Sequence, residues 1–161
     1  KKSVLVQSER LWVRGTDIRV GRQAAPSDLE LIPLEARNMD VIARLDLDSY
    51  VEGVLPAEMP VAWPLEALKA QAVAARSFAL KQRSDRSSKD FDVESTVYDQ
   101  AYQYNDENRH PLWAAKIKHA VRATRGEILL DEGRHILKAF YSADCGCPSE
   151  DPKFVWGKVA A

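Results

Sequence analysis

Short alternations of apolar and polar residues predict β-strands in the first third of the chain. Residues 4–6 and 11–20 alternate in this way, and Gly15 and Gly21 interrupt the pattern at positions that suit turns. Residues 24–38 contain two prolines and mixed polarity, which predicts an extended connection with short strands. Residues 39–46 predict a further strand.

Helical spacing replaces the alternation in the middle of the chain. Asp48 and Ser49 can cap a short helix over residues 50–55, which we expect Pro56 to end. A long helix is predicted from Pro64 to about residue 83, because proline suits the first turn of a helix. Its apolar residues recur every three or four positions and predict a core-facing stripe of Leu65, Leu68, Ala72, Ala75 and Ala79.

The last third predicts one more helix, a hairpin and a loop. The helix covers residues 111–125, and Gly126 ends it. Residues 127–131 and 135–141 read as the two strands of a β-hairpin, and residues 142–157 as a loop. We therefore expect an α+β fold, with mixed helices and mainly antiparallel strands around a long central helix with a groove. Residues 1–161 would form a single domain, with a small N-terminal β lobe over about residues 1–40.

Composition and charge exclude several classes of protein. The chain has 161 residues, 45% of them apolar and 29% charged, which is enough apolar material for a folded core. The net charge of -1 argues against a dedicated nucleic-acid binder. Charged residues interrupt every apolar stretch before it reaches the ~20 residues of a membrane span.

The usual signatures of nucleophilic, phosphate-binding and metal-binding sites are missing. There is no Gly-x-Ser-x-Gly motif and no glycine-rich phosphate loop, and His110, His119 and His135 are scattered. Each histidine is expected to serve the structure. Cys145 and Cys147 are two residues apart, so they can be free thiols, a strained disulfide or half of a metal site. The sequence leaves these three alternatives open.

One acidic residue has an unusual setting. Glu58 stands among apolar residues and near three prolines, just before the long helix. The prolines would make this segment stiff, and apolar surroundings would remove water from the carboxyl group. Desolvation raises the pKa of a carboxyl group and suits it to general-acid catalysis. By itself this setting is more often that of an ordinary solvated loop glutamate.

The residues around Glu58 resemble a known family. The segment 50–60 followed by 65–79 closely resembles the signature of the stage II sporulation protein D (SpoIID-like) family. Weaker matches to other segments of that family follow in the expected order at residues 100–102, 124–129, 139–146 and 156–157.

The resemblance implies an enzyme that cuts peptidoglycan glycan strands, as a lytic transglycosylase does at the β-1,4 bond between N-acetylmuramic acid and N-acetylglucosamine. It implies that Glu58 is the catalytic acid and base. Such an enzyme can work with one carboxyl group, because the C6 hydroxyl of the muramic acid attacks in place of water. The substrate-binding residues expected beside Glu58 are Lys69, Asp99, Gln100, Tyr102, Tyr141 and Glu150.

Two residues depart from the family pattern. Cys147 replaces the second glycine after the family cysteine, and Asp99 replaces a histidine that some relatives have before the glutamine. Some relatives bind zinc near this cysteine through Cys and His. Because no matching histidine spacing is present, we expect no metal and no cofactor here, and a zinc-dependent enzyme remains an alternative.

Two further functions stay open beside lytic transglycosylation. A second carboxylate facing Glu58, such as Asp99, Glu150 or Asp151, would activate water and make a lysozyme-type muramidase with a preference for deacetylated glycan. The chain could also be a non-catalytic wall-binding module that enhances an amidase. In each case the expected partner is the peptidoglycan glycan strand, with no nucleic acid and no membrane span. The expected location is extracytoplasmic, periplasmic or secreted, with the export signal absent from this sequence.

Overall fold

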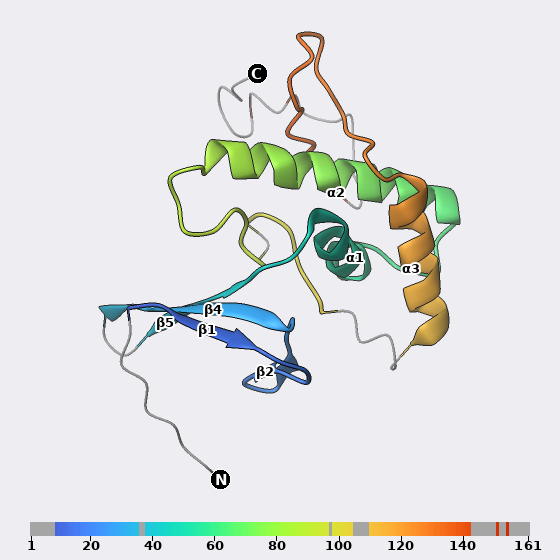
Figure 1. The fold of residues 1–161 in the computed structure, drawn as a ribbon. Coiled ribbons are helices and arrows are strands. Elements are labelled where there is room, and N and C mark those ends of the chain that lie inside the picture. Colours follow the sequence, from blue (N-terminus) through green and yellow to red (C-terminus); the bar gives the residue numbers. More distant parts are fainter. Residues whose placement is uncertain are drawn as a thin grey trace. The chain divides into compact units, whose positions relative to one another are not determined.

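The computed structural model describes residues 9–35, 38–96, 98–104, 110–142, 151 and 154. The chain divides into two compact units, Lys1–Asp46 and Leu47–Ala161. The first contains the strands and the second the helices, so the expected α+β class is confirmed (Figure 1). Within the described residues, none of the helices is long and apolar enough to cross a membrane.

The first unit is built on a three-stranded antiparallel sheet with the strand order β1-β4-β5. The strands β2 and β3 form a separate two-stranded hairpin in the same unit. This hairpin turns at Gly21, whose φ of +62° suits glycine. The strands are β1 (Leu11–Arg14), β2 (Arg19–Val20), β3 (Gln23–Ala24), β4 (Asp28–Pro33) and β5 (Met39–Ala43).

The central strand of this sheet is only partly what the sequence predicts. The segment expected to be an extended connection with short strands contains the six-residue strand β4, which pairs with both β1 and β5. Its strand pattern is hard to recognise because Glu30, a charged residue, is one of its buried positions. The strand expected from residue 39 is confirmed as β5.

Glu30 is buried with two arginine partners. Arg10 and Arg44 donate to its two carboxylate oxygens at 2.7 Å and 2.9 Å. The hydrogen bonds from Arg44 and then Arg10 hold the pKa of Glu30 below its ordinary value. The Arg44 guanidinium also lies over the Trp12 ring, 4.3 Å from its centroid, so these four residues form one polar and aromatic cluster.

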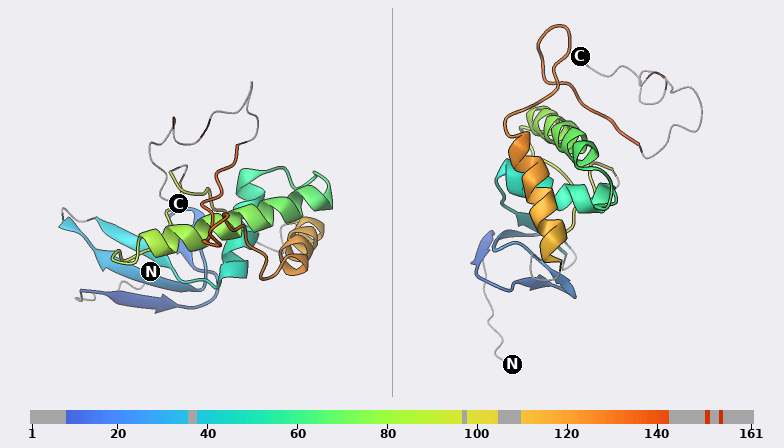
Figure 2. Two further views of the ribbon diagram at one scale, coloured as in Figure 1. Left: turned by 90° about the horizontal axis from the view of Figure 1, so that it is seen from above. Right: turned by 90° about the vertical axis from the view of Figure 1, so that its right-hand side faces the viewer.

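The second unit is a cluster of three helices, α1 (Leu47–Glu58), α2 (Leu65–Asp85) and α3 (Pro111–Ala123). Each helix packs against the other two, and α2 is the longest (Figures 1 and 2). Their shared core consists of small and aliphatic side chains: Val51, Val54, Leu55, Val61, Leu68, Ala72, Ala75, Ile117, Ala120 and Val121. The long helix, its apolar stripe and the last helix are therefore confirmed.

The expected end of the first helix at Pro56 is wrong. Pro56 lies inside α1, which continues to Glu58. A proline lacks one backbone N–H, so it removes the bond to the carbonyl four residues earlier, but its fixed φ is compatible with a helix. The last turn is still closed, because the N–H of Met59 donates to the carbonyl of Leu55 at 3.1 Å. Glu58 is thus held on a helix and not in a loop.

The predicted hairpin after α3 is present in a reduced form. Gly126, with a φ of +79°, follows the end of α3. Beyond it, the two arms meet in a single antiparallel bridge between Leu130 and Ile136, and the N–H of Leu137 donates to the carbonyl of Leu129 at 3.0 Å. The arms are therefore extended segments joined at one point, and they lead the chain from α3 to Tyr141.

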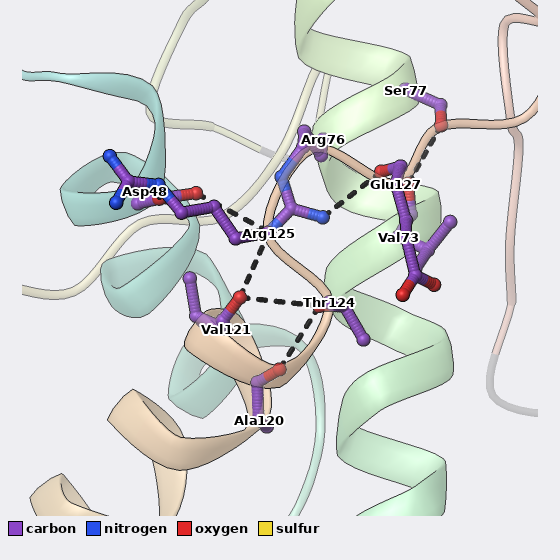
Figure 3. A network of polar contacts seen from close by, with 9 residues as sticks. All are labelled: Asp48, Val73, Arg76, Ser77, Ala120, Val121, Thr124, Arg125 and Glu127. Atoms are coloured by element: carbon purple, nitrogen blue, oxygen red, sulfur yellow. Dashed lines mark hydrogen bonds and ion pairs between the residues drawn. The ribbon is translucent and has the colours of Figure 1, made fainter.

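A buried arginine attaches this segment to the helices (Figure 3). Arg76 of α2 is 2% exposed and donates to the carbonyls of Val121 at 3.3 Å and Glu127 at 3.1 Å. It also pairs with Asp48 in the first turn of α1, at 3.4 Å. Next to it, the hydroxyl of Ser77 accepts a hydrogen bond from the N–H of Leu129 at 2.8 Å. One turn of α2 thereby holds the start of α1, the end of α3 and the segment after it.

Candidate functional site

Glu58 is the last residue of α1 and is partly buried. The backbone N–H of Ala101 donates to its Oε1 at 2.6 Å. Five residues earlier on α1, the carbonyl of Gly53 accepts from the N–H of Gln103 at 2.9 Å. These two bonds hold residues 101–103 alongside α1 and fix the Glu58 carboxyl group by one of its oxygens.

A close contact explains the glycine in α1. A Cβ at Gly53 would overlap the ring of Tyr102, so only glycine allows this ring to lie against the helix. The Tyr102 ring also stacks on Tyr50, with 5.8 Å between centroids and 5° between planes. Burial, and to a lesser extent Tyr104 and Glu52, raise the pKa of Tyr102 to about 12. The stacked Tyr102 ring therefore helps to hold the Tyr50 ring in place.

Tyr50, Gln100 and Tyr141 form a row of hydrogen bonds. The Tyr50 hydroxyl donates to Oε1 of Gln100 at 3.0 Å, and Nε2 of Gln100 donates to the Tyr141 hydroxyl at 3.0 Å. The same nitrogen lies 3.4 Å from the carbonyl of Ala75 on α2. Gln100 is fully buried and all of its polar atoms face protein groups. The row joins α1, the segment after residue 98 and the end of the hairpin.

Tyr141 is connected to Glu58 through neighbouring residues, because Gln100 donates to the Tyr141 hydroxyl and the N–H of the next residue, Ala101, donates to Glu58. Burial raises the pKa of Tyr141 to about 12, against the opposite effect of Gln100, and the negative charge of Glu58 adds to the increase. The same charge, behind burial and the neighbouring Tyr141 and Asp99, contributes to the raised pKa of Tyr50. Both hydroxyls thus remain protonated at neutral pH. The ring of Phe140, edge-on to Phe78 at 6.0 Å, supports the segment that carries Tyr141.

Gln71 is a further polar residue beside Tyr141. Its amide lies close enough to the Tyr141 hydroxyl to affect that group's pKa. Its Nε2 is buried and has no hydrogen-bond partner. A donor left unpaired in this way costs stability, so its place next to Tyr141 calls for an explanation.

The carboxylate of Asp99 is enclosed by protein donors. Arg86 binds both of its oxygens, at 2.5 Å and 3.2 Å, and Gln82 donates to Oδ1 at 2.6 Å. The N–H of Glu94 donates to Oδ2 at 2.7 Å, and the side chain is 1% exposed. Asp99 thereby anchors the segment that carries Gln100 and Ala101 to the C-terminal half of α2.

The remaining predicted site residues are less closely connected to Glu58. Lys69 is 26% exposed on α2 and pairs with Glu66 at 2.7 Å. Glu150, Cys145 and Cys147 lie outside the described residues. In the part of the chain that is described, no three His, Cys, Asp or Glu side chains are grouped so that they could hold a metal ion. His135 instead pairs with Asp131 at 3.2 Å, and His110 stacks on Trp113.

Sequence reasoning missed Tyr50 and Gln71 as members of this site. The signal for Tyr50 was its spacing of eight residues from Glu58, which places both on one face of a continuous helix. The predicted break at Pro56 concealed this relation. Gln71 lies on the same helix as Lys69, and no pattern distinguishes it from the other polar residues there.

Comparison with known proteins places the same region in one family. Residues 35–130 match the sequence model of a family described as SpoIID, stage II sporulation protein. This range contains Tyr50, Glu58, Gln71 and Gln100, and ends shortly before Tyr141.

Individual relatives agree with that match. The chain is 38% identical over 120 residues to an uncharacterized protein of Brachyspira hyodysenteriae, covering 74% of this chain and 31% of the relative. It is 30% identical over 161 residues to the stage II sporulation protein D of Bacillus subtilis, covering 94% of this chain and 47% of the relative. It is 34% identical over 106 residues to an amidase enhancer of Bacillus subtilis, covering 66% and 13%. The chain thus spans less than half the length of each of these relatives.

Proposed function

The chain belongs to the SpoIID (stage II sporulation protein) family, and on this premise we propose that it acts on the bacterial cell wall by cleaving peptidoglycan glycan strands. The bond cleaved is the β-1,4 linkage between N-acetylmuramic acid and N-acetylglucosamine. Glu58 is the general acid and base. The protein works outside the cytoplasm, where this polymer lies.

The observation that carries the proposal is the way Glu58 is held. The Ala101 N–H occupies Oε1, so a proton on the carboxyl group belongs on Oε2, where it can be given to a substrate oxygen. The carboxyl group is partly buried at a helix end, with the Tyr141 hydroxyl nearby. A fixed acid beside hydroxyl groups is what protonation of a glycosidic oxygen requires.

The position of Asp99 supports lytic transglycosylation over hydrolysis. A hydrolytic muramidase needs a second carboxylate that can activate water. Both oxygens of Asp99 are bound by Arg86, Gln82 and the Glu94 N–H, so this residue has none to offer. In the proposed mechanism Glu58 protonates the glycosidic oxygen, and the C6 hydroxyl of the muramic acid then gives up its proton to Glu58 and attacks the anomeric carbon. The product then has a 1,6-anhydro end.

Lys69 is proposed to bind the lactyl carboxylate of the muramic acid. It is partly exposed, and its partner Glu66 is three residues away on the surface of α2. A surface pair of this kind contributes about 1 kcal/mol or less, so the lysine can exchange Glu66 for a carboxylate of the substrate.

Digestion of purified sacculi by the wild-type chain, Glu58→Gln and Glu132→Gln tests the proposal. Glutamine keeps the size of Glu58 and cannot donate the proton, whereas Glu132 is an exposed residue of the hairpin turn and serves as the control. Mass spectrometry should find anhydro ends with the wild type and with Glu132→Gln, and none with Glu58→Gln. Thermal unfolding of each variant shows that the fold is kept. Cleavage by Glu58→Gln at the wild-type rate contradicts the proposal, and new reducing ends would indicate a muramidase.

A role as an enhancer of an amidase is the second candidate, because one relative is an amidase enhancer. This role requires binding to the wall or to the amidase and does not require an acid at position 58. An amidase assay on sacculi separates the two functions. Stimulation that survives Glu58→Gln, from a chain that releases no glycan fragments, would support the enhancer.

A further inference from the structure

The row Tyr50–Gln100–Tyr141 has a direction that the backbone carbonyl of Ala75 determines. The carbonyl of Ala75 can only accept hydrogen bonds, so the atom of Gln100 that faces it, at 3.4 Å, is Nε2. The other proton of Nε2 then points to the Tyr141 hydroxyl, at 3.0 Å. Oε1 of Gln100 faces the opposite way, and the Tyr50 hydroxyl must donate to it.

The direction of the row leaves one hydrogen uncommitted. Because Tyr141 accepts from Gln100, its own O–H is not used in that bond. Gln100 precedes Ala101, whose N–H binds Glu58, so the Tyr141 hydroxyl that Gln100 holds belongs to the same region as the Glu58 carboxyl group. Tyr141 therefore presents a hydrogen-bond donor in the region where Glu58 acts.

Tyr50 is fixed from several sides. Its ring stacks on Tyr102, which can approach α1 only because residue 53 is glycine. Its hydroxyl donates to the fully buried Gln100. A rigid ring on the same helix face as Glu58 therefore helps to hold the Gln100 amide in the orientation that the Ala75 carbonyl sets.

We infer that Tyr50 is a positioning residue, which acts through Gln100 to hold the Tyr141 hydroxyl as a hydrogen-bond donor to a sugar oxygen next to the bond that Glu58 protonates. This inference rests on the proposed function. In this inference Tyr141 contacts the substrate and Gln100 orients the Tyr141 hydroxyl. Tyr50 holds Gln100 through its own hydroxyl. Without the Tyr50 hydroxyl, Gln100 Oε1 loses its donor, the amide can turn, and the Tyr141 hydrogen is drawn toward Gln100.

Three tyrosine-to-phenylalanine variants test the inference, each assayed by kcat and KM on a soluble, defined glycan oligosaccharide. Tyr141→Phe should lower kcat by about a hundredfold, the usual effect of losing one donor to the transition state. Tyr50→Phe keeps the ring and its stack, and should lower kcat by about tenfold with little change in KM. Tyr98→Phe is the control, because this side chain is 85% exposed.

The double variant Tyr50→Phe/Tyr141→Phe separates positioning from a general structural effect. If Tyr50 acts through Tyr141, the double variant should have the kcat of Tyr141→Phe alone. Losses that multiply would show that Tyr50 acts by another route and would overturn the inference. Gln100→Met removes the hydrogen-bonded link between Tyr50 and Tyr141, and should reproduce the kinetics of Tyr50→Phe. This variant replaces Tyr50→Phe in the test if Tyr50→Phe unfolds.

The two levels of the argument fail differently. Wild-type kinetics for Tyr50→Phe, with Glu58→Gln inactive, refutes the positioning role and leaves the proposed function standing. Cleavage that persists in Glu58→Gln, or is absent from the wild type, refutes the proposed function and the positioning role with it. An NMR readout adds a check: the Gln100 side-chain amide resonances should shift in Tyr50→Phe and remain unchanged in Tyr98→Phe.

Discussion

Gln71 is the residue at which stability and activity are expected to oppose each other. Its buried Nε2 has no partner, and the Tyr141 hydroxyl is nearby. Replacing an unsatisfied buried donor by an apolar side chain of similar size removes a cost of about 1–3 kcal/mol. Gln71→Met should therefore leave the free energy of unfolding unchanged or raise it by about 1 kcal/mol. We also expect glycan cleavage to fall, because Gln71 lies beside the Tyr141 hydroxyl.

A second glutamine of α2 provides the matched control. Gln82 is also buried, but its Nε2 donates to Asp99 at 2.6 Å. Gln82→Met removes a satisfied hydrogen bond to a buried carboxylate and should lower the free energy of unfolding by about 1–3 kcal/mol. Urea unfolding measures both variants. A loss of stability in Gln71→Met equal to that of Gln82→Met would show that Gln71 is an ordinary structural residue.

For single residues, the sequence identifies candidate site residues more readily than it identifies the residues that they contact. The family motif leads to Glu58, Gln100 and Tyr141, and the structure places these three in one region. The partner of Gln100 on α1, Tyr50, is 50 residues away, and no local pattern encodes such a contact. Asp99 shows the same limit. Its place next to Gln100 suggests a substrate contact, whereas its bonds to Arg86 depend on where α2 ends.

Secondary-structure elements were predictable where one residue pattern dominates. The apolar stripe of α2 and the glycine after α3 gave both helices nearly to their ends. The pattern failed where one residue opposes its neighbours. Pro56 suggests a helix end, although the packing of Val54 and Leu55 in the core keeps the helix intact to Glu58. Glu30 conceals β4, because the arginines that neutralise it come from other parts of the sheet.

The arrangement of the helices around Arg76 leads to a prediction about two arginines that share one carboxylate. Asp48 pairs with Arg76, which is 2% exposed, and with Arg125, which is 80% exposed. Removing one partner from a buried pair costs about 3 kcal/mol or more, and removing an exposed partner costs about 1 kcal/mol or less. Arg76→Met should therefore destabilise the chain strongly, and Arg125→Met only slightly.

Urea unfolding followed by circular dichroism at the helix band compares these two variants. Arg76 also donates to the carbonyls of Val121 and Glu127, so its loss should loosen the segment that leads to Tyr141 (Figure 3). Hydrogen exchange should then show faster exchange at the Leu129 amide in Arg76→Met. Equal effects of the two substitutions would mean that burial does not determine the contribution of these ion pairs.

For the whole molecule, the division into two compact units means that stability need not respond uniformly to pH. The first unit has at most 46 residues, a size at which a hydrophobic core alone contributes little. Its buried ion cluster at Glu30, with Arg10 and Arg44, is accordingly an important part of its stability. The second unit depends on a helical core of aliphatic side chains and on its own ion pairs, Asp48 with Arg76 and Asp99 with Arg86.

Acid should therefore weaken the strands through Glu30. The pKa of Glu30 is held below its ordinary value of 4.5 by Arg44 and Arg10, so its contribution is fully present above that pH. The contribution is lost as the pH falls through the lowered pKa of the folded state, because protonation ends both ion pairs. Hydrogen exchange of the β4 amides, compared between the wild type and Glu30→Gln at each pH, measures the contribution of the Glu30 charge. The comparison at equal pH removes the effect of intrinsic exchange rates. Wild-type β4 should be better protected than the variant at pH 7, and the two should converge in acid while α2 shows no difference. A difference in protection between the wild type and Glu30→Gln that persists after Glu30 is protonated would contradict this assignment. The shape of the side chain, and not its charge, would then account for the difference.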